Sequence, residues 1–212
     1  MKSRLVALAS CLTVIVSVPA FAQPVTVGLT GGTLGIGPEA SYRLNDNVAV
    51  RGNATFLGVG GKFDSDDAKY DASVKLKSVG VMLDVFPFGG SFFVSGGARI
   101  NKNKASVDAF FPAGSEIGDE ETLVDTTVYG RAHVKDFAPQ LTIGWAGTRN
   151  SSLSFGIEAG VLFQGKVKLD PLTETSGTVS LTDLEVERQS LQDDVDDYKV
   201  YPILQAKIAY TF

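Results

Sequence analysis

Seven charged residues stand out because they lie in segments where apolar residues alternate with small polar ones. Each occupies the small-polar side of its segment: Glu39, Asp84, Glu158, Arg43, Arg51, Arg99 and Lys207. Side chains that alternate in this way point to opposite faces of a strand, which places the seven charges on one face. Three acids and four bases in a water-poor interior must pair, because an unpaired buried charge is strongly destabilising. The pattern predicts an internal charge network, which either closes the interior or lines a narrow pore.

Residues that could carry catalysis or hold a metal are few. The only histidine, His133, lacks the His-x-Ser spacing of small lipid-deacylating enzymes, because Val134 and Lys135 follow it. The acidic runs 64–67 and 193–197 supply oxygen ligands suited to Ca²⁺, but neither has the spacing of an EF-hand loop. We therefore expect no catalytic residues, no metal site and no cofactor.

The composition narrows the class of protein. The chain has 212 residues, of which 44% are hydrophobic and 20% charged, with 23 glycines and a formal charge of −5. It is too apolar for a disordered chain, and it lacks the basic patch of a nucleic-acid-binding protein. After residue 22, no run of about 20 apolar residues remains to form a transmembrane helix.

The first 22 residues have the features of a secretory signal peptide. Lys2 and Arg4 precede the apolar stretch 5–18, and an Ala-x-Ala site ends at Ala22. We expect cleavage there, leaving a single domain over residues 23–212 and taking the charge from −5 to −7 as Lys2 and Arg4 are lost. Removal of Cys11 would exclude thiol chemistry. A retained membrane anchor and lipoprotein acylation at Cys11 are the alternatives.

Eight segments of the remaining chain alternate with period two, which is typical of strands. They cover residues 25–29, 34–44, 48–56, 78–85, 92–101, 137–145, 153–164 and 200–212. Short turns at 45–47, 87–90 and 147–150 contrast with long polar stretches at 60–70, 103–133 and 166–198. This organisation predicts an antiparallel transmembrane β-barrel of about eight strands. Residues 25–44 form either two strands or one bent strand.

Two further patterns distinguish a membrane barrel from a soluble β-sandwich or a lipocalin-like barrel. The polar faces of the segments are poor in Lys and Glu, whereas a water-exposed face would be rich in them. Aromatic residues also gather near both ends of the segments, as in the girdles of membrane barrels. One set, near the short turns, includes Tyr42, Phe86 and Trp145, and the other, near the long stretches, includes Phe56, Phe63 and Tyr70.

A helix is expected in the last long stretch, over residues 183–198. Thr182 and Glu185 have the spacing of a capping box, and Leu184, Leu191, Val195 and Tyr198 form an apolar stripe. Such a helix could cover the mouth of the barrel. The basic residues of the long stretches either contact lipopolysaccharide phosphates or are solvated; they are Lys62, Lys69, Lys102, Lys104, Arg131, Lys135, Lys166 and Lys168.

The last strand, 200–212, ends on an aromatic residue and resembles the C-terminal strand of bacterial outer-membrane proteins. The whole of 25–212 resembles small eight-stranded barrels of the OmpA membrane-domain and OmpW-like superfamily. It is more closely similar to an uncharacterised proteobacterial outer-membrane group, in the segments 32–37, 86–90, 160–165 and 191–197. The resemblance implies the outer membrane of a Gram-negative cell, a monomer, contacts with outer-membrane lipid and lipopolysaccharide, and an assembly signal at Tyr210 and Phe212 read by the barrel-assembly machinery.

The interior of an eight-stranded barrel is only wide enough to be filled by its own side chains. We therefore expect an integral outer-membrane protein with a structural or surface-interaction role and a largely filled lumen, rather than an open porin. The alternative is a narrow channel or transporter for small hydrophobic or ionic solutes, as the OmpW-like resemblance implies. A lipid-modifying enzyme is a third hypothesis, which rests on His133 alone.

Overall fold

The computed structural model describes residues 25–65, 68–117, 120–147 and 152–212. The predicted leader, residues 1–22, lies outside the described residues, as do the first two residues of the predicted mature chain, Asp66 and Asp67 of the first acidic run, and the end of the turn 147–150.

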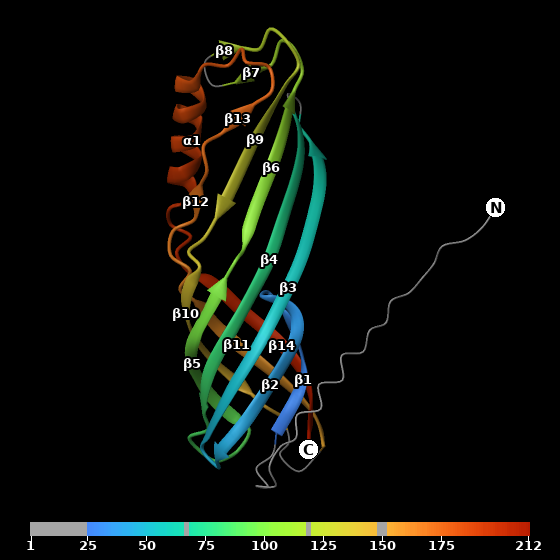
Figure 1. The fold of residues 1–212 in the computed structure, drawn as a ribbon, viewed down its shortest axis with the longest axis vertical. Helices are drawn as coiled ribbons and strands as arrows, with labels where there is room; N and C mark the ends of the chain where they lie inside the picture. Colours follow the sequence, from blue (N-terminus) through green and yellow to red (C-terminus); the bar gives the residue numbers. More distant parts are fainter. Residues whose placement is uncertain (1–24, 66–67, 118–119, 148–151) are drawn as a thin grey trace, which may run out of the picture.

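Among the described residues, eight strands pair in a closed antiparallel order, which we call the ring (Figure 1). In spatial order from the first strand, they are β1 (Val25–Gly32), β2 (Gly35–Asn45), β3 (Val48–Asp64), β4 (Lys69–Val85), β5 (Phe92–Asn101), β10 (Phe137–Trp145), β11 (Leu153–Leu162) and β14 (Tyr201–Thr211). Pairing of β1 with β14 completes the closure. The eight alternating segments of the sequence are these eight strands, and residues 25–45 form two of them.

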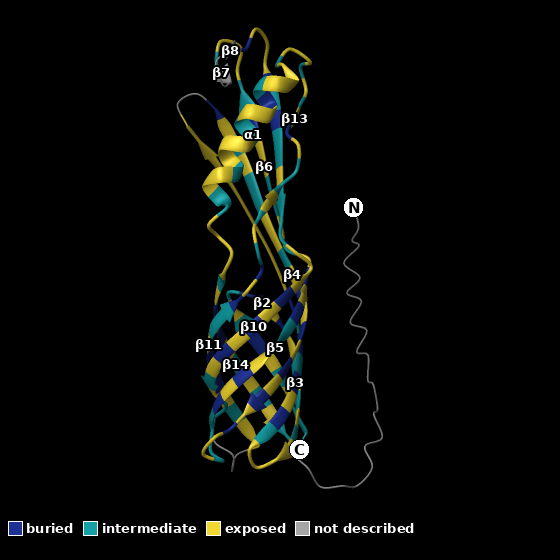
Figure 2. Ribbon diagram, turned by 90° about the vertical axis from the view of Figure 1, so that its left-hand side faces the viewer, coloured by how far each residue is buried: buried dark blue, intermediate teal, exposed yellow. Residues whose placement is uncertain are grey.

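Alternation along the ring strands separates an apolar outward face from a polar interior. On β4, Val79 and Val81 are 54% and 62% exposed, whereas the inward residues Ser78 and Asp84 are 5% and 4% exposed. The same contrast recurs around the ring as a chequered pattern of exposed and buried residues (Figure 2). The girdle prediction is wrong at Phe86, which is buried inside the ring. It is also wrong at Phe63 and Tyr70, which stack on each other near the far end of the β3–β4 hairpin.

A second part of the molecule, which we call the extension, continues the ring wall beyond one rim (Figures 1 and 2). It consists of the outer halves of β3 and β4 with β6 (Lys104–Phe111), β9 (Thr126–His133), β12 (Lys168–Leu169) and β13 (Thr173–Glu174). The short strands β7 (Glu116–Ile117) and β8 (Glu120–Glu121) form a separate hairpin. The sequence predicted long polar loops at 60–70, 103–133 and 166–198. In the structure, part of each stretch instead forms strands, and the last also contains a helix.

The extension keeps the register of the ring. Strand β4 pairs Ser78 with Asn101 of β5 and then Lys75 with Lys104 of β6, so no residue is gained or lost between the two partners. In the same way, Ile100 of β5 pairs with Phe137 of β10, and Lys104 of β6 pairs with His133 of β9. The face that is outward on the ring therefore continues as one face of the extension.

The predicted helix is present as α1 (Leu181–Val195), but its start and its position differ from the prediction. The Ser180 hydroxyl accepts a hydrogen bond from the Asp183 amide and caps the helix, in place of the Thr182–Glu185 box. Leu184 is buried against Val128 and Leu172 of the extension, so the helix lies on the extension and does not plug the ring. Among the described residues, no helix has both the length and the apolar character to cross a membrane.

Candidate functional site

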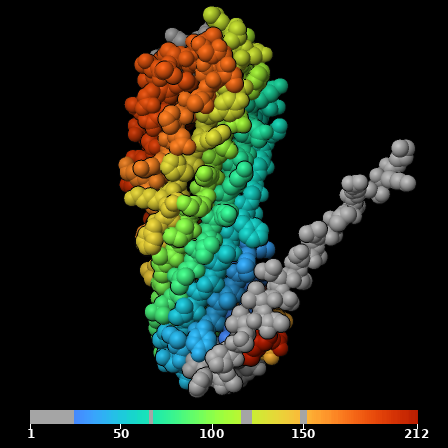
Figure 3. All heavy atoms as spheres, in the orientation of Figure 1, coloured from blue at the N-terminus to red at the C-terminus, as the bar shows by residue number. Residues whose placement is uncertain are grey.

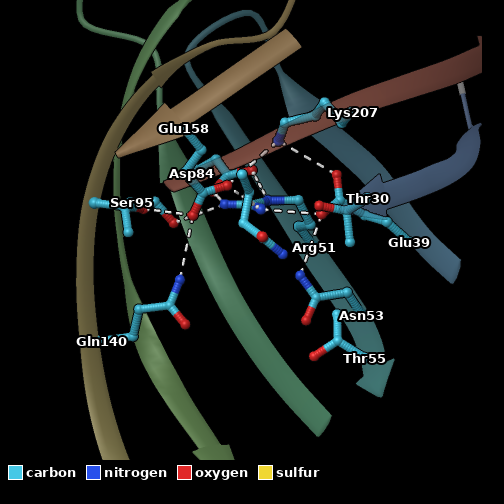
Figure 4. A network of polar contacts seen from close by, with 12 residues as sticks. Thr30, Glu39, Arg51, Asn53, Thr55, Asp84, Ser95, Gln140, Glu158 and Lys207 are labelled. Carbon is cyan, nitrogen blue, oxygen red and sulfur yellow. Dashed lines mark hydrogen bonds and ion pairs between the residues drawn. The ribbon is translucent and has the colours of Figure 1, made fainter. Parts of the chain in front are cut away.

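Five of the seven predicted charged residues meet inside the ring (Figure 4). Glu39 comes from β2, Arg51 from β3, Asp84 from β4, Glu158 from β11 and Lys207 from β14. Strand alternation turns each of them inward, and ring closure brings residues more than 100 positions apart within contact distance. Ion pairs connect these five residues into one network, which we call the ion cluster.

Arg51 lies at the centre of the ion cluster, and each of its five N–H bonds has an acceptor. Its Nε and Nη2 donate to the two oxygens of Asp84 at 2.8 and 3.0 Å, which is the bidentate geometry that strengthens such pairs. Nη1 donates to Glu158 at 2.6 Å and to Glu39 at 3.1 Å, and Nη2 also donates to the Ser95 hydroxyl. With 3% of its surface exposed, Arg51 is a buried cation whose hydrogen-bonding capacity is filled.

Lys207 provides the second positive charge of the cluster. Its Nζ lies 3.3 Å from an oxygen of Glu39 and 3.5 Å from an oxygen of Glu158, so it bridges the two carboxylates that share Nη1 of Arg51. The same Nζ lies 4.9 Å from the centre of the Phe93 ring. The cluster therefore holds three acids and two bases, which leaves one formal negative charge for a neighbouring cation to balance.

Arg99 is that neighbouring cation, although it touches no carboxylate. Its guanidinium donates to the hydroxyls of Ser78 and Thr55 and to the side-chain oxygen of Gln140. Gln140 then donates to Glu158 at 3.2 Å, which links Arg99 to the ion cluster through one amide. The direct acid–base pairing expected of Arg99 is replaced by neutral acceptors.

Arg43, the remaining predicted member, lies apart from the cluster at the short-turn end of the ring. Its guanidinium carbon is 3.8 Å from the centre of the Phe86 ring, and Nη1 donates to the Asp46 carbonyl. A cavity of about 450 Å³ extends from this end of the ring to Arg51 and Lys207. The ion cluster forms the inner end of that cavity.

The other end of the ring interior is closed by apolar side chains that were not predicted as a unit. Leu34, Ala138, Leu162 and Ile203 pack together at 3% exposure or less, with Tyr201 against them; we call the four the apolar plug. Alternation over the predicted segment 34–44 would place Leu34 on the outward face with Ile36, but Leu34 lies in the β1–β2 turn, where alternation no longer applies. The turn is held down by Tyr201, whose hydroxyl donates to the Thr33 carbonyl.

The sequence also does not single out the uncharged polar residues of the site. Ser95, Gln140 and Thr142 are buried and hydrogen-bond the charged groups directly. Their positions on the small-polar face of the strands were visible in the sequence, but residue type alone did not mark them as partners of Arg51 or Glu158. The closed pairing order of the strands is needed to find them.

His133 lies outside the ring, on β9 of the extension. Its Nδ1 is 3.2 Å from Oδ1 of Asp170, and both side chains are nearly half exposed. In the acidic run at the end of α1, Asp196 pairs with Lys166 and Asp197 lies 4.0 Å from Lys199, and the described residues hold no group of three or more potential metal ligands.

The two residues of the expected assembly signal are exposed at the end of the last strand. Tyr210 and Phe212 are 46% and 77% exposed, and their rings meet edge to face with centres 5.0 Å apart. The backbone amide of Phe212 donates to the Val25 carbonyl, which fixes the last residue against β1.

Comparison with known proteins identifies a shared fold. No protein-family model matches the chain, and no curated protein matches it. The crystal structure of Acinetobacter baumannii CarO is similar, with a TM-score of 0.63 and 20% identity over 89% of this chain and 98% of that one. CarO2 of the same organism has a TM-score of 0.63 and 19% identity, with the same coverage. A major outer membrane protein of Thermus thermophilus has a TM-score of 0.45 and 14% identity over 90% of this chain and all of that one.

Proposed function

We propose that the chain is an integral outer-membrane β-barrel protein with a filled lumen and a structural or surface-interaction role. The observation that carries the proposal is the inverted distribution of side chains in the ring. A hydrogen-bonded cluster of charges occupies the interior, and exposed Val, Leu, Ile and Phe side chains cover the outside. A water-soluble barrel requires the opposite arrangement, whereas a bilayer solvates an apolar outer face.

Closure of the ring is what makes spanning a bilayer feasible. Within a hydrocarbon core, every backbone N–H and C=O group must find a partner in the protein, and a closed antiparallel ring has no unpaired edge. The strands that face the bilayer are each eight or more residues long. The predicted leader 1–22 fits export to the outer membrane, and Tyr210 with Phe212 would be read by the barrel-assembly machinery during insertion of the monomer.

Two obstructions in the lumen, the ion cluster and the apolar plug, favour a structural role over the conduction of ions. The ion cluster and the apolar plug lie in succession along the ring interior, and both are built from residues of the ring strands, with Leu34 of the β1–β2 turn completing the plug. Bacterial barrels have their short turns in the periplasm, so the extension and α1 would lie outside the cell. A filled ring that carries a rigid extracellular sheet is suited to presenting a surface.

Two measurements test this proposal. The purified protein should migrate differently on gels before and after boiling, as compact membrane barrels do, and planar bilayers that contain it should show no unitary conductance. Identical migration with and without boiling would contradict the membrane barrel. Stable unitary conductance would contradict the filled lumen.

A narrow channel for small ionic solutes is the second candidate. The observation in its favour is the cavity of about 450 Å³ that leads from the short-turn end to Arg51 and Lys207. Such a channel would require the ion cluster to rearrange and the apolar plug to open. Conductance that changes in Arg51→Ala or Arg99→Ala would support this candidate, and a silent bilayer with all three proteins would exclude it.

A further inference from the structure

A concave basic site lies on the outer surface where the ring wall continues into the extension. The recess has a volume of about 600 Å³, and we define it by five basic residues on three neighbouring strands and the β5–β6 link: Lys75, Lys102, Lys104, Arg131 and His133. It stands out in a chain whose formal net charge is −5. We propose that this basic recess binds the phosphate groups of an anionic lipid headgroup in the leaflet around the ring. The inference rests on the proposed membrane location.

The first argument is the pairing of like charges. Lys75 of β4 lies directly opposite Lys104 of β6 in an antiparallel pair, and such a pair of like charges is destabilising. Arg131 follows on the next strand, opposite Ser106. Among the described residues, these three cations have no carboxylate within ion-pair distance. Three cations therefore lie together without a carboxylate of the described residues to pair with, so an anion from outside the protein would neutralise them.

The acids near the recess are already engaged. Asp136 pairs with Lys102, and Asp170 lies against His133. With His133 neutral, four cations and two anions leave the recess with a formal charge of +2. Arginine and lysine are the usual phosphate ligands of proteins, and an anion seated in the recess would relieve the repulsion between Lys75 and Lys104.

The second argument is the height of the recess on the wall. The continuous register places the recess on the face that is outward on the ring, immediately beyond the apolar residues Val79, Ile100 and Phe137, which are 51 to 60% exposed. Lys102 lies two residues beyond Ile100, or about 7 Å along a strand, whereas Lys75 and Lys104 lie four residues beyond Val79 and Ile100, or about 13 Å, from where their long side chains can extend back toward the apolar wall. The headgroup layer occupies about 5–7 Å beyond each side of the hydrocarbon core. The acyl chains would therefore lie along the apolar wall and the phosphates beside the cations.

The neighbouring surface supports the same position. Lys77 is exposed on the outward face of β4, and its carbonyl accepts a hydrogen bond from the Lys102 amide, which adds another cation at the level nearest the apolar wall. Lys168 pairs with His133 in the strand ladder and extends the basic row sideways. In the space-filling view, the teal and green bands of β3 and β4 run from the ring into the extension without interruption (Figure 3). The cations therefore begin two residues beyond the apolar wall, where a bilayer presents its phosphates, and continue for four more residues along the strands.

The test uses the full chain in vesicles of phosphatidylcholine that contain one of three probes at equal mole fraction: bisphosphorylated lipid A, monophosphorylated lipid A, or the same glycolipid without phosphate. Lipid retained by the purified protein is measured by mass spectrometry. We expect the bisphosphorylated form to be retained at least about tenfold over the form without phosphate. In the variant Lys75→Gln/Lys104→Gln/Arg131→Gln, this preference should fall to about twofold or less.

The matched control is Lys62→Gln/Lys69→Gln/Lys199→Gln, which removes the same charge from positions outside the recess and should keep the full preference. Equal loss of the phosphate preference in both variants would show that net charge alone causes it, and would overturn the proposal. Full competition by millimolar inorganic phosphate would overturn the lipid source in favour of a general anion site. Migration before and after boiling is read on the same samples. If migration shows that the protein does not fold into a membrane barrel, the proposed function is refuted. If the protein is inserted but shows no preference for phosphorylated lipid, only the proposal for the basic recess is refuted.

Discussion

Substitution of Arg51 by methionine removes the centre of the ion cluster and keeps much of the side-chain volume. The three carboxylates of Glu39, Asp84 and Glu158 then share Lys207 as their only remaining cation in the cluster, and Asp84 has no direct base at all. Loss of one partner from a buried ion pair typically destabilises a protein by about 3–5 kcal/mol. Because Arg51 serves three carboxylates, we expect a loss at or above the top of that range.

The free energy of unfolding can be measured by urea titration of the protein in detergent micelles or thin vesicles, with tryptophan fluorescence as the signal. Arg43→Met is the matched control, since Arg43 lies at the mouth against Phe86, where a cation–π contact is worth about 1 kcal/mol. Arg51→Lys should fall between the two, because it keeps the charge but not the five directed donors. Acidification should restore part of the stability lost in Arg51→Met by neutralising the stranded carboxylates. If Arg51→Met costs no more than Arg43→Met, the ion cluster does not hold the lumen together.

Four other outcomes are expected. Leu162→Ala, in the apolar plug, should lower the free energy of unfolding by about 2–5 kcal/mol in the same titration, and a change below about 1 kcal/mol would mean that the plug is loosely packed. Leu184→Asp should release α1 from the extension, seen as faster amide hydrogen exchange in the helix, while migration before boiling stays that of the folded ring. Deletion of Phe212 should reduce the folded fraction in cells but leave refolding in detergent nearly unchanged, because the side chain is 77% exposed; equal defects in both would argue for a structural role instead. Hydrogen bonds from Arg188 lower the pKa of Glu185 from 4.5 to about 2, so their contribution to α1 should be complete above pH 4.5 and be lost as the pH falls toward 2, as an NMR titration of Glu185 would show.

The ring was predictable because each of its strands carries a two-residue repeat strong enough to identify its faces. On β4, the run from Val79 to Val85 alternates except at Met82, an apolar residue on the inward face. The outer half of the same strand, with Lys69, Asp71, Lys75 and Lys77 on one face and a mixture of Val, Leu, Ala and Tyr on the other, is not recognisable as a membrane strand from the sequence. Its outward face is polar, so the contrast that indicates a membrane strand is absent there, although the pairing with β3 continues unchanged.

The candidate site was predictable as a set of charges but not as a geometry. Inward alternation was enough to select Arg51, Glu158 and Lys207. Which acid meets which base depends on the order in which strands distant in sequence become neighbours, and on the stagger between them. That information is carried by the whole ring, which is why Arg43 and Arg99 were grouped with the cluster although neither touches its carboxylates. Leu34 was misassigned because a turn residue does not follow the repeat of the strand beside it.

The unbroken register between the ring wall and the extension restricts how such a chain can change in length. Four neighbouring segments of the sheet cross the rim side by side. They are β3, β4, the segment in which β5 continues into β6, and the segment in which β9 continues into β10. An inserted residue in one of them would turn every side chain beyond it to the opposite face, exchanging the surface under α1 for the surface that carries Lys75 and Lys104. An extension that keeps this pairing throughout, without a β-bulge, therefore grows or shrinks by two residues in all four segments at once. Its height is adjustable in steps of about 7 Å, each of which adds or removes residues at four separate places in the gene.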